Sequence, residues 1–260
     1  MSRIAEIHAF ALRGLPLFQP GMAIAREIGA AIDRAGEVLR PGDVCVIAQK
    51  IVSKCEGRRV ALADVAVGAE ARALAAKTSR EAALLQLILD ESSEILRATP
   101  AAVIARHRTG HVLANAGIDA SNVEGGDAGS VLLWPVDPDA SARAIRAGIG
   151  EVAGVRPAVV IADSMGRAWR IGTVGTAIGC AGIAAVEDRR GTGQDLFGRT
   201  LQATVIAIAD SLAATAALVM GEGDEGTPVA ILRGCERWVT AADGPGAAGG
   251  LRPVAEDMFR

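Results

Sequence analysis

The sequence predicts a mixed α/β (α+β) protein with two lobes and with neither a P-loop nor a Rossmann domain. Short apolar runs of strand length are interspersed irregularly with segments of helical periodicity, so the chain is not a regular succession of βαβ units. Hydrophobic residues make up 50% of the 260 residues, but aromatic residues only 3%. Such a core, rich in Ala and Val, favours closely packed helices and strands over an aromatic-lined pocket.

The first predicted elements are a helix and a strand. Apolar residues recur at helical spacing over 22–32, after a Pro-Gly pair, and Gly36 is a plausible end for that helix. The turn at Pro41-Gly42 leads into residues 43–48, an apolar run of strand length. This segment is therefore expected to be a buried strand.

A long helical region and a polar loop follow. Residues 64–96 are rich in Ala, Leu, Glu and Arg, contain no proline and are predicted to be helical, with Pro100 closing the region. Residues 109–129 are rich in Gly, Asn, Asp and Ser, which indicates a loop or a strand followed by a loop. The glycines at 125–129 are one place where the two lobes could join.

The next segments again have strand and helix signals. Residues 131–136 and 158–162 are predicted strands, and the second is expected to place Asp163 and Ser164 at its end. Between them, Asp137-Pro138-Asp139 has the composition of a helix start, and the helix should end near 148–150.

The C-terminal part alternates Gly-rich and apolar segments. Residues 166–193 are rich in Gly, 196–220 are predicted to form a long helix, and 221–227 form a tight acidic loop. Residues 228–232 are a predicted strand. The tail after Trp238 is expected to be mobile, because Gly, Ala and Pro dominate it.

Composition excludes several classes of protein. Basic and acidic residues nearly balance, 27 against 30, which argues against a nucleic-acid partner. The four cysteines form no CxxC pair, and no signal peptide begins the chain, so we expect reduced thiols and a cytoplasmic location. The apolar run 201–220 has Asp210 at its middle, which costs about 2.5–3.5 kcal/mol on membrane-insertion scales. A buried helix, not a membrane span, is predicted.

Two familiar motifs do not fit their usual roles. The chain lacks the P-loop motif, and the glycines of GEGDEG at 221–226 follow a predicted helix and precede a strand, the reverse of a dinucleotide-binding loop. The acidic residues of that loop would repel phosphate unless a metal lies between them. His107 and His111 have a zinc-ligand spacing, but Arg-Thr-Gly between them makes a helix doubtful, and surface or turn positions are favoured.

Carboxylates in glycine-bordered loops are the stronger signal. Asp119 lies in GIDASN, Asp163 follows an apolar run, and Glu222 begins the acidic loop. Carboxylate oxygens are preferred ligands of Mg²⁺ and Mn²⁺. Each residue also has an ordinary alternative, namely an Asx-turn for Asp119, a cap for Asp163 and a solvated side chain for Glu222.

Two clusters of cations are candidates for anion binding. Lys50 and Lys54 follow the strand at 43–48, where a lysine suits a phosphate, although exposed lysines at a strand end are the simpler alternative. Arg167, Trp169 and Arg170 could bind a planar anionic ligand or could anchor a protein interface.

Several blocks of sequence, in this order, resemble the coenzyme F420-0:L-glutamate ligase family over about residues 12–234. The blocks are LPLF at 15–18, GDVCVIAQKIVSKCEG at 42–57, GIDASNVE at 117–124, DSMGRAWRIGTVGTAIGCAG at 163–182, and DLFGRTLQATVIAIADSLAATAALVMGEGDEGTPVAILRG at 195–234. The resemblance implies one ligase domain at 1–240 with a tail at 241–260 and without a C-terminal nitroreductase-like domain. It also implies the family's unusual two-lobed fold and a homodimer.

The resemblance further implies the reaction. GTP activates a carboxylate of F420-0 as an acyl phosphate, and the amino group of L-glutamate displaces the phosphate, with further γ-linked additions in some members. Mn²⁺ or Mg²⁺, as two ions, supports the reaction, and K⁺ is a further candidate. The alternatives are a ligase or transferase of the same fold for another acceptor, and a non-catalytic nucleotide-binding subunit.

The family's functional positions map onto this sequence as follows. Lys54, Asp119 and Asp163 are the implied catalytic residues. The implied metal ligands are Asp119, Asp163, Glu222 and, more weakly, Ser164. Gln49 departs from the serine common in the family, and Ser164 replaces its usual threonine. The implied GTP contacts are Leu15, Pro16, Leu17, Phe18, Gln49, Lys50, Lys54, Asn122, Met220, Gly221, Glu222, Gly223, Asp224, Glu225, Gly226 and Thr227.

Overall fold

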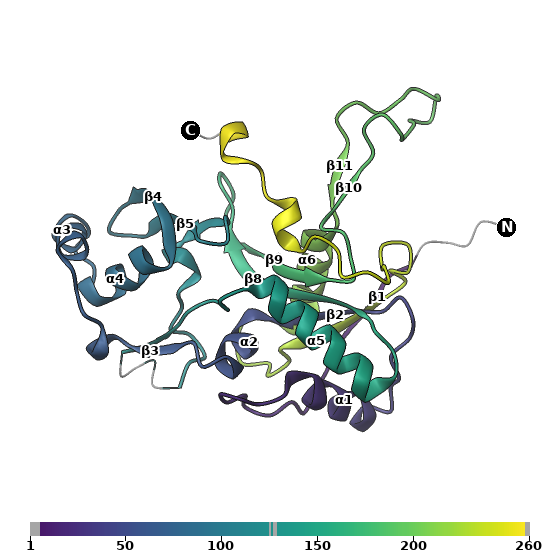
Figure 1. Cartoon of the computed structure of the whole chain (residues 1–260), viewed down its shortest axis with the longest axis horizontal. Coiled ribbons are helices and arrows are strands. Elements are labelled where there is room, and N and C mark those ends of the chain that lie inside the picture. Colours follow the sequence, from purple (N-terminus) through teal and green to yellow (C-terminus); the bar gives the residue numbers. More distant parts are fainter. Residues whose placement is uncertain (1–5, 125, 127–128, 258–260) are drawn as a thin grey trace.

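The computed structural model describes residues 6–124, 126 and 129–257, which form a larger and a smaller lobe (Figure 1). A five-stranded sheet with the strand order β1-β12-β2-β8-β9 forms the centre of the larger lobe. Only β2 and β8 are parallel neighbours, and the other pairs are antiparallel. The strands are β1 (His8–Ala11), β2 (Val44–Ala48), β8 (Ala158–Gly166), β9 (Thr173–Ala181) and β12 (Val229–Arg233). The mixed α/β prediction and the strands expected at 43–48, 158–162 and 228–232 are confirmed.

Helices cover both faces of this sheet. On β2, Cys45 and Ile47 pack with α1 (Ile24–Arg34) and α5 (Pro138–Ala153), which lie side by side in Figure 1. The alternate residues, Val44 and Val46, pack with α6 (Ile208–Met220) on the opposite face. The period-2 alternation of a strand thus lets one apolar run fill two cores.

The predicted start of α5 is confirmed, and its predicted end is wrong. The carboxylate of Asp137 accepts a hydrogen bond from the amide of Ala140 at 2.9 Å, and Pro138 occupies the first turn. The helix runs through the glycines at 148–150 and ends at Ala153, followed by the cap Gly154, whose φ of 69° only glycine adopts readily. Gly148 lies inside because a Cβ there would come within 2.9 Å of Ala25 on α1.

The smaller lobe has its own apolar core. It contains α3 (Ala69–Thr78), α4 (Ala82–Asp90) and a sheet of β4 (Ser92–Ala98), β5 (Val103–His107) and β6 (Val112–Ala114). The single helical region predicted at 64–96 is wrong in three places, the first being residues 65–68, which precede α3 and are not helical. The left-handed backbone of Ser79 interrupts it, and residues from 92 onward pair with β5 as a strand.

Several boundaries in the second half also differ from the prediction. Asp163 and Ser164 lie within β8, not at its end, because pairing with β9 continues to Gly166. The Gly-rich segment contains β9 and β10 (Val186–Asp188). The helix predicted from 196 begins only at Ile208, since β11 (Val205–Ala207) pairs with β10 in a hairpin that projects from the larger lobe (Figure 1).

The remaining elements are short. The strand expected at 131–136 is only β7 (Ser130–Leu132), which pairs with β3 (Arg59–Ala61). Helix α2 (Gln49–Cys55) follows β2 directly. Turns of 3-10 helix occur at η1 (Leu62–Asp64), η2 (Asn115–Gly117), η4 (Ala247–Gly250) and η5 (Val254–Glu256). Of the suggested lobe junction at 125–129, residues 125, 127 and 128 lie outside the described residues.

The described part of the tail packs against both lobes, contrary to the mobile tail expected, and Arg106 on β5 donates to Asp257 at 3.4 Å. Ala247 is buried, and its amide donates to the carboxylate of Asp139 at 2.7 Å. The fully buried guanidinium of Arg146 donates to Asp243 at 2.6 Å.

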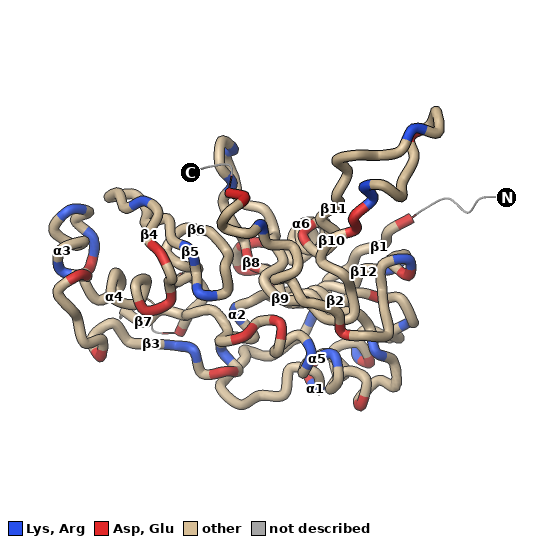
Figure 2. The backbone as a smooth tube through the Cα atoms, turned by 45° about the horizontal axis from the view of Figure 1, so that its top comes forward, with Lys and Arg blue, Asp and Glu red and all other residues tan. Residues whose placement is uncertain are grey.

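Acidic and basic positions are interspersed over both lobes (Figure 2). Among the described residues, none of the helices has the length and apolarity needed to cross a membrane.

Candidate functional site

A cavity of about 690 Å³ lies where the two lobes meet. Its wall comes mainly from the segment before α1, the β2–α2 junction, the loop after β6, the C-terminal half of β8 and the loop between α6 and β12. Every residue implied above for GTP or metal lines this one cavity. These residues are Leu15, Pro16, Leu17, Phe18, Gln49, Lys50, Lys54, Asp119, Asn122, Asp163, Ser164, Met220, Gly221, Glu222, Gly223, Asp224, Glu225, Gly226 and Thr227.

The two lysines of α2 reach across to the loop after β6. Lys50 Nζ lies 2.7 Å from Asp119 Oδ2, and Lys54 Nζ donates to the carbonyl oxygen of Asn122 at 2.7 Å. Burial, together with the nearby charge of Lys50, lowers the pKa of Lys54. The exposed-lysine alternative is therefore wrong, because both ammonium groups are partnered and face the cavity.

Asp119 is a charged carboxylate at rest. Burial alone would raise its pKa, but the hydrogen bonds from Lys50 and from the amide and hydroxyl of Ser121 outweigh it, and the pKa lies below the ordinary value. The amide of Ser121 donates to Asp119 Oδ1 at 2.8 Å, which is the Asx-turn proposed as an alternative. Asp119 thus forms an Asx-turn and also faces the cavity, so the turn does not exclude a role in metal binding.

Asp163 has a different environment. The indole Nε1–H of Trp134 donates to its Oδ2 at 2.8 Å, and the amide of Ser164 donates to Oδ1 at 2.9 Å. Burial raises the pKa of Asp163 to about 6, and the nearby charge of Asp119 adds to the rise, although the two hydrogen bonds and Lys50 oppose it. This carboxylate is therefore short of positive partners.

The acidic loop between α6 and β12 is closed by its own contacts. Thr227 donates from its hydroxyl to the carbonyl of Met220 at 2.7 Å, and the amide of Gly223 donates to the carboxylate of Glu225 at 2.8 Å. The hydroxyl of Ser164 donates to Glu222 at 2.7 Å, so Glu222 is not a freely solvated side chain. The loop follows a helix and precedes a strand, which confirms that it has no Rossmann geometry.

The oxygen donors fit a hard divalent cation in their chemistry. Asp119 and Asp163 face one cavity, and the charge of one raises the pKa of the other. Mg²⁺ and Mn²⁺ prefer such oxygens and complete their coordination with water or substrate phosphates. Among the described residues, no three Asp, Glu, His or Cys side chains are gathered closely enough to hold a metal by themselves. Asp119 and Asp163 could therefore be two ligands of such a cation, with water or substrate oxygens as the others.

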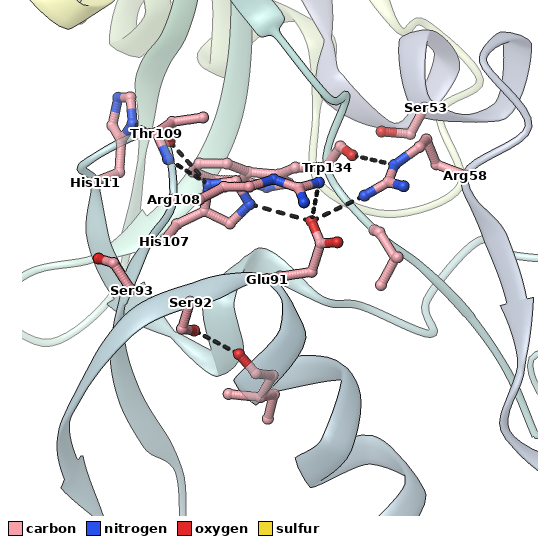
Figure 3. A network of polar contacts seen from close by, with 12 residues as sticks. Ser53, Arg58, Glu91, Ser92, Ser93, His107, Arg108, Thr109, His111 and Trp134 are labelled. Carbon is pink, nitrogen blue, oxygen red and sulfur yellow. Dashed lines mark hydrogen bonds and ion pairs between the residues drawn. The ribbon is translucent and has the colours of Figure 1, made fainter. Parts of the chain in front are cut away.

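A buried polar network beside the cavity was not anticipated from the sequence. His107 and His111 are buried and not at the surface, and they lie on β5 and its turn, not on a helix. Glu91 accepts hydrogen bonds from Arg58 at 2.8 Å and from Arg108 at 2.7 Å (Figure 3). The partners lie far apart in the chain, so spacing offers no signal for them. Trp169, by contrast, is 92% exposed and is not part of the cavity wall.

Comparison with known proteins gives one consistent result. The family model described as F420-0:Gamma-glutamyl ligase matches residues 14–234. The coenzyme F420:L-glutamate ligase of Methanothermobacter thermautotrophicus is 43% identical over 254 residues, 98% of this chain and 99% of that protein. Those of Methanocaldococcus jannaschii and Archaeoglobus fulgidus are 42% and 41% identical, covering 95% and 88% of this chain and 94% and 88% of those proteins. The chain belongs to the F420-0:gamma-glutamyl ligase family.

Proposed function

We propose that this protein is a GTP- and divalent-metal-dependent ligase that joins L-glutamate to coenzyme F420-0. The observation that carries the proposal is the single cavity that gathers five separate chain segments, each with residues implied for nucleotide or metal binding. Support for the acceptor and the amino acid comes from relatives named coenzyme F420:L-glutamate ligase, which match this chain over nearly its whole length.

The proposed reaction has two steps. A carboxylate oxygen of F420-0 attacks the γ-phosphorus of GTP, forming an acyl phosphate and releasing GDP. The amino nitrogen of L-glutamate then attacks the acyl carbon, so that an amide forms, phosphate leaves, and the nitrogen loses a proton. Repetition at the γ-carboxylate would add further glutamates.

The side chains of the chain serve this reaction by charge and position. Lys54 and Lys50 place two ammonium groups at the wall of the cavity, and Lys54 would stabilise the negative charge that develops on the transferred phosphoryl group. Phosphoryl transfer is catalysed mainly by positioning and charge neutralisation, so no nucleophilic side chain is needed. The segment at 15–18 and the loop at 220–227 would enclose the nucleotide.

Asp119 and Asp163, with Ser164 and Glu222, would hold one or two Mn²⁺ or Mg²⁺ ions, and K⁺ is a further candidate. Such an ion supplies charge neutralisation between the acidic loop and the phosphates. The proposed enzyme acts in the cytoplasm as a homodimer.

The test is the mass of the product. Purified protein incubated with F420-0, L-glutamate, GTP and Mn²⁺ should convert F420-0 into products heavier by whole glutamyl residues. Asp119→Ala and Asp163→Ala should each lower the rate at least about 100-fold at saturating metal, because charge neutralisation is the main catalytic resource. Full turnover in either variant would refute the metal role. An unchanged acceptor mass with the wild type would refute the ligase itself.

A further inference from the structure

A tryptophan behind the cavity wall connects Asp163 to the buried polar network. Trp134 is fully buried and does not line the cavity. Its indole N–H and the amide of Ser164 each hold one oxygen of Asp163, at 2.8 and 2.9 Å. Both donors are neutral, so they fix the orientation of the carboxylate while its charge remains available.

Contacts with two histidine rings and with the backbone of a glycine keep the indole in place. The rings of His107 and His111 lie with their centroids 4.9 and 5.5 Å from the tryptophan ring (Figure 3). The backbone of Gly117 approaches the indole edge, where a Cβ would come within 2.3 Å of Nε1. Its φ of 74° also favours glycine at this close contact. The indole N–H therefore has one accessible orientation, toward Asp163.

The backbone of Trp134 is fixed as well. Arg58 Nε donates to the carbonyl oxygen of Trp134 at 2.8 Å, and the same guanidinium pairs with Glu91 at 2.8 Å (Figure 3). Glu91 is held in turn by Arg108 at 2.7 Å. A charged cluster of the smaller lobe thus determines the position of a donor to the carboxylate of the larger lobe.

We propose that Trp134 is a positioning residue that acts through Asp163. The proposal rests on the function proposed above, in which Asp163 binds a divalent cation. A carboxylate held through Oδ2 by a rigid donor presents its remaining lone pairs to the cavity in one direction. Loss of such an outer partner typically costs about 10–100-fold in metal affinity or activity.

The test is Trp134→Phe in the full chain, with Trp238→Phe as the matched control. Trp238 also donates its indole N–H to a carboxylate, that of Glu187 at 3.2 Å, but on the β10 side of the molecule. Titration calorimetry with Mn²⁺ alone should show about 10-fold weaker binding or more for Trp134→Phe and an unchanged Kd for Trp238→Phe. The kcat of ligation should fall by a similar factor, with a change of less than about 3-fold in KM for F420-0.

A spectroscopic measurement separates positioning from core packing. The chain has 3 tryptophans, so nitrogen-15 labelling gives 3 indole N–H resonances. Added Mg²⁺ should shift the Trp134 resonance in the wild type and leave it unshifted in Asp163→Asn. If Trp134→Phe fails to fold, benzothienylalanine at position 134 keeps the shape of the indole without its N–H, and the same weakening is expected.

The outcomes distinguish the two proposals. Wild-type protein that binds Mn²⁺ and forms product, with variants at 134 that match it in Kd and kcat, would overturn the positioning role alone. Wild-type protein that neither binds Mn²⁺ nor changes the mass of F420-0 would overturn the proposed function and this inference with it.

Discussion

At the scale of single residues, the two aspartates of the cavity differ in what balances their charge. Asp119 has an ammonium group at 2.7 Å, whereas Asp163 has only neutral donors and a raised pKa. A cation at Asp163 would therefore relieve a desolvated carboxylate, while a cation at Asp119 must compete with Lys50. In the proposed function, a metal ion at Asp119 would release Lys50, whose ammonium group could then bind a phosphate.

Glu91 gives a prediction about stability and pH. Burial alone would raise its pKa, but the contact with His107 at 3.5 Å, the hydrogen bond from Arg58 and the charges of Arg58 and Arg108 lower it overall. Because the pKa of Glu91 is lower in the folded protein, the charged carboxylate stabilises the fold at pH values above about 4.5, the ordinary pKa of the group. This contribution is lost as the pH falls below that value and through the lowered pKa. Glu91→Gln should lower the free energy of unfolding at pH 7 by about 1–3 kcal/mol, measured by urea denaturation.

The same measurement near pH 4 should show a smaller difference between Glu91→Gln and the wild type. Asp188→Asn is the control, because Asp188 pairs with Arg190 in an exposed ion pair and should show no measurable change at either pH. A loss of unfolding free energy in Glu91→Gln that is the same at both pH values would contradict a stabilising role for the charged carboxylate.

The sequence predicted the residues that line the cavity, but not the buried polar network beside it. Lys54 and Asp119 lie in polar segments with a recognisable chemistry, so the resemblance could place them. Glu91 and Arg58 are 33 positions apart and meet only through the fold of the smaller lobe. No local pattern distinguishes such a buried charged pair from two surface residues.

At the scale of elements, close approach of backbones limits which side chains the sheet can carry. Gly179 on β9 faces the first turn of α5, and a Cβ there would lie 2.4 Å from the carbonyl of Pro138. Gly179→Ala should therefore lower the free energy of unfolding by about 1–3 kcal/mol, measured by thermal or urea denaturation. Gly166→Ala on β8 is the control, since no atom lies within 4 Å of the added Cβ. Equal stability of both variants would contradict the close contact.

Segments with a single clear helix or strand pattern were predicted correctly, whereas segments that contain more than one element were not. The core strand β2 and the capped start of α5 follow from local patterns alone. In the helix predicted at 196–220, residues 196–204 form turns, 205–207 form β11 and only 208–220 form α6. Pairing with β10 decides this division, and that partner is not visible in a local window.

At the scale of the whole molecule, polar contacts across the cavity join its separate walls. Lys54 on α2 holds the carbonyl of Asn122, and the side-chain amide of Asn122 donates to the carbonyl of Gly223 at 3.1 Å. These two hydrogen bonds, together with the pairing of Lys50 and Asp119, link three segments of the cavity wall. A ligand that contacts all of the walls should hold them together more firmly than these bonds do.

Nucleotide binding should accordingly stabilise the whole fold, and Lys54 should be required for much of the effect. A non-hydrolysable GTP analogue at about 100 times its Kd, with Mg²⁺, stabilises a one-site protein by about 2.7 kcal/mol, which raises the Tm of a chain of this size by roughly 5–10 °C. Lys54→Met should show a much smaller rise, because it removes a cation from the wall facing the phosphates. Differential scanning fluorimetry measures both.

Lys77→Met is the control, because that lysine of α3 lies outside the cavity, and its Tm rise should equal that of the wild type. An equal rise in Lys54→Met would contradict a phosphate contact at this residue.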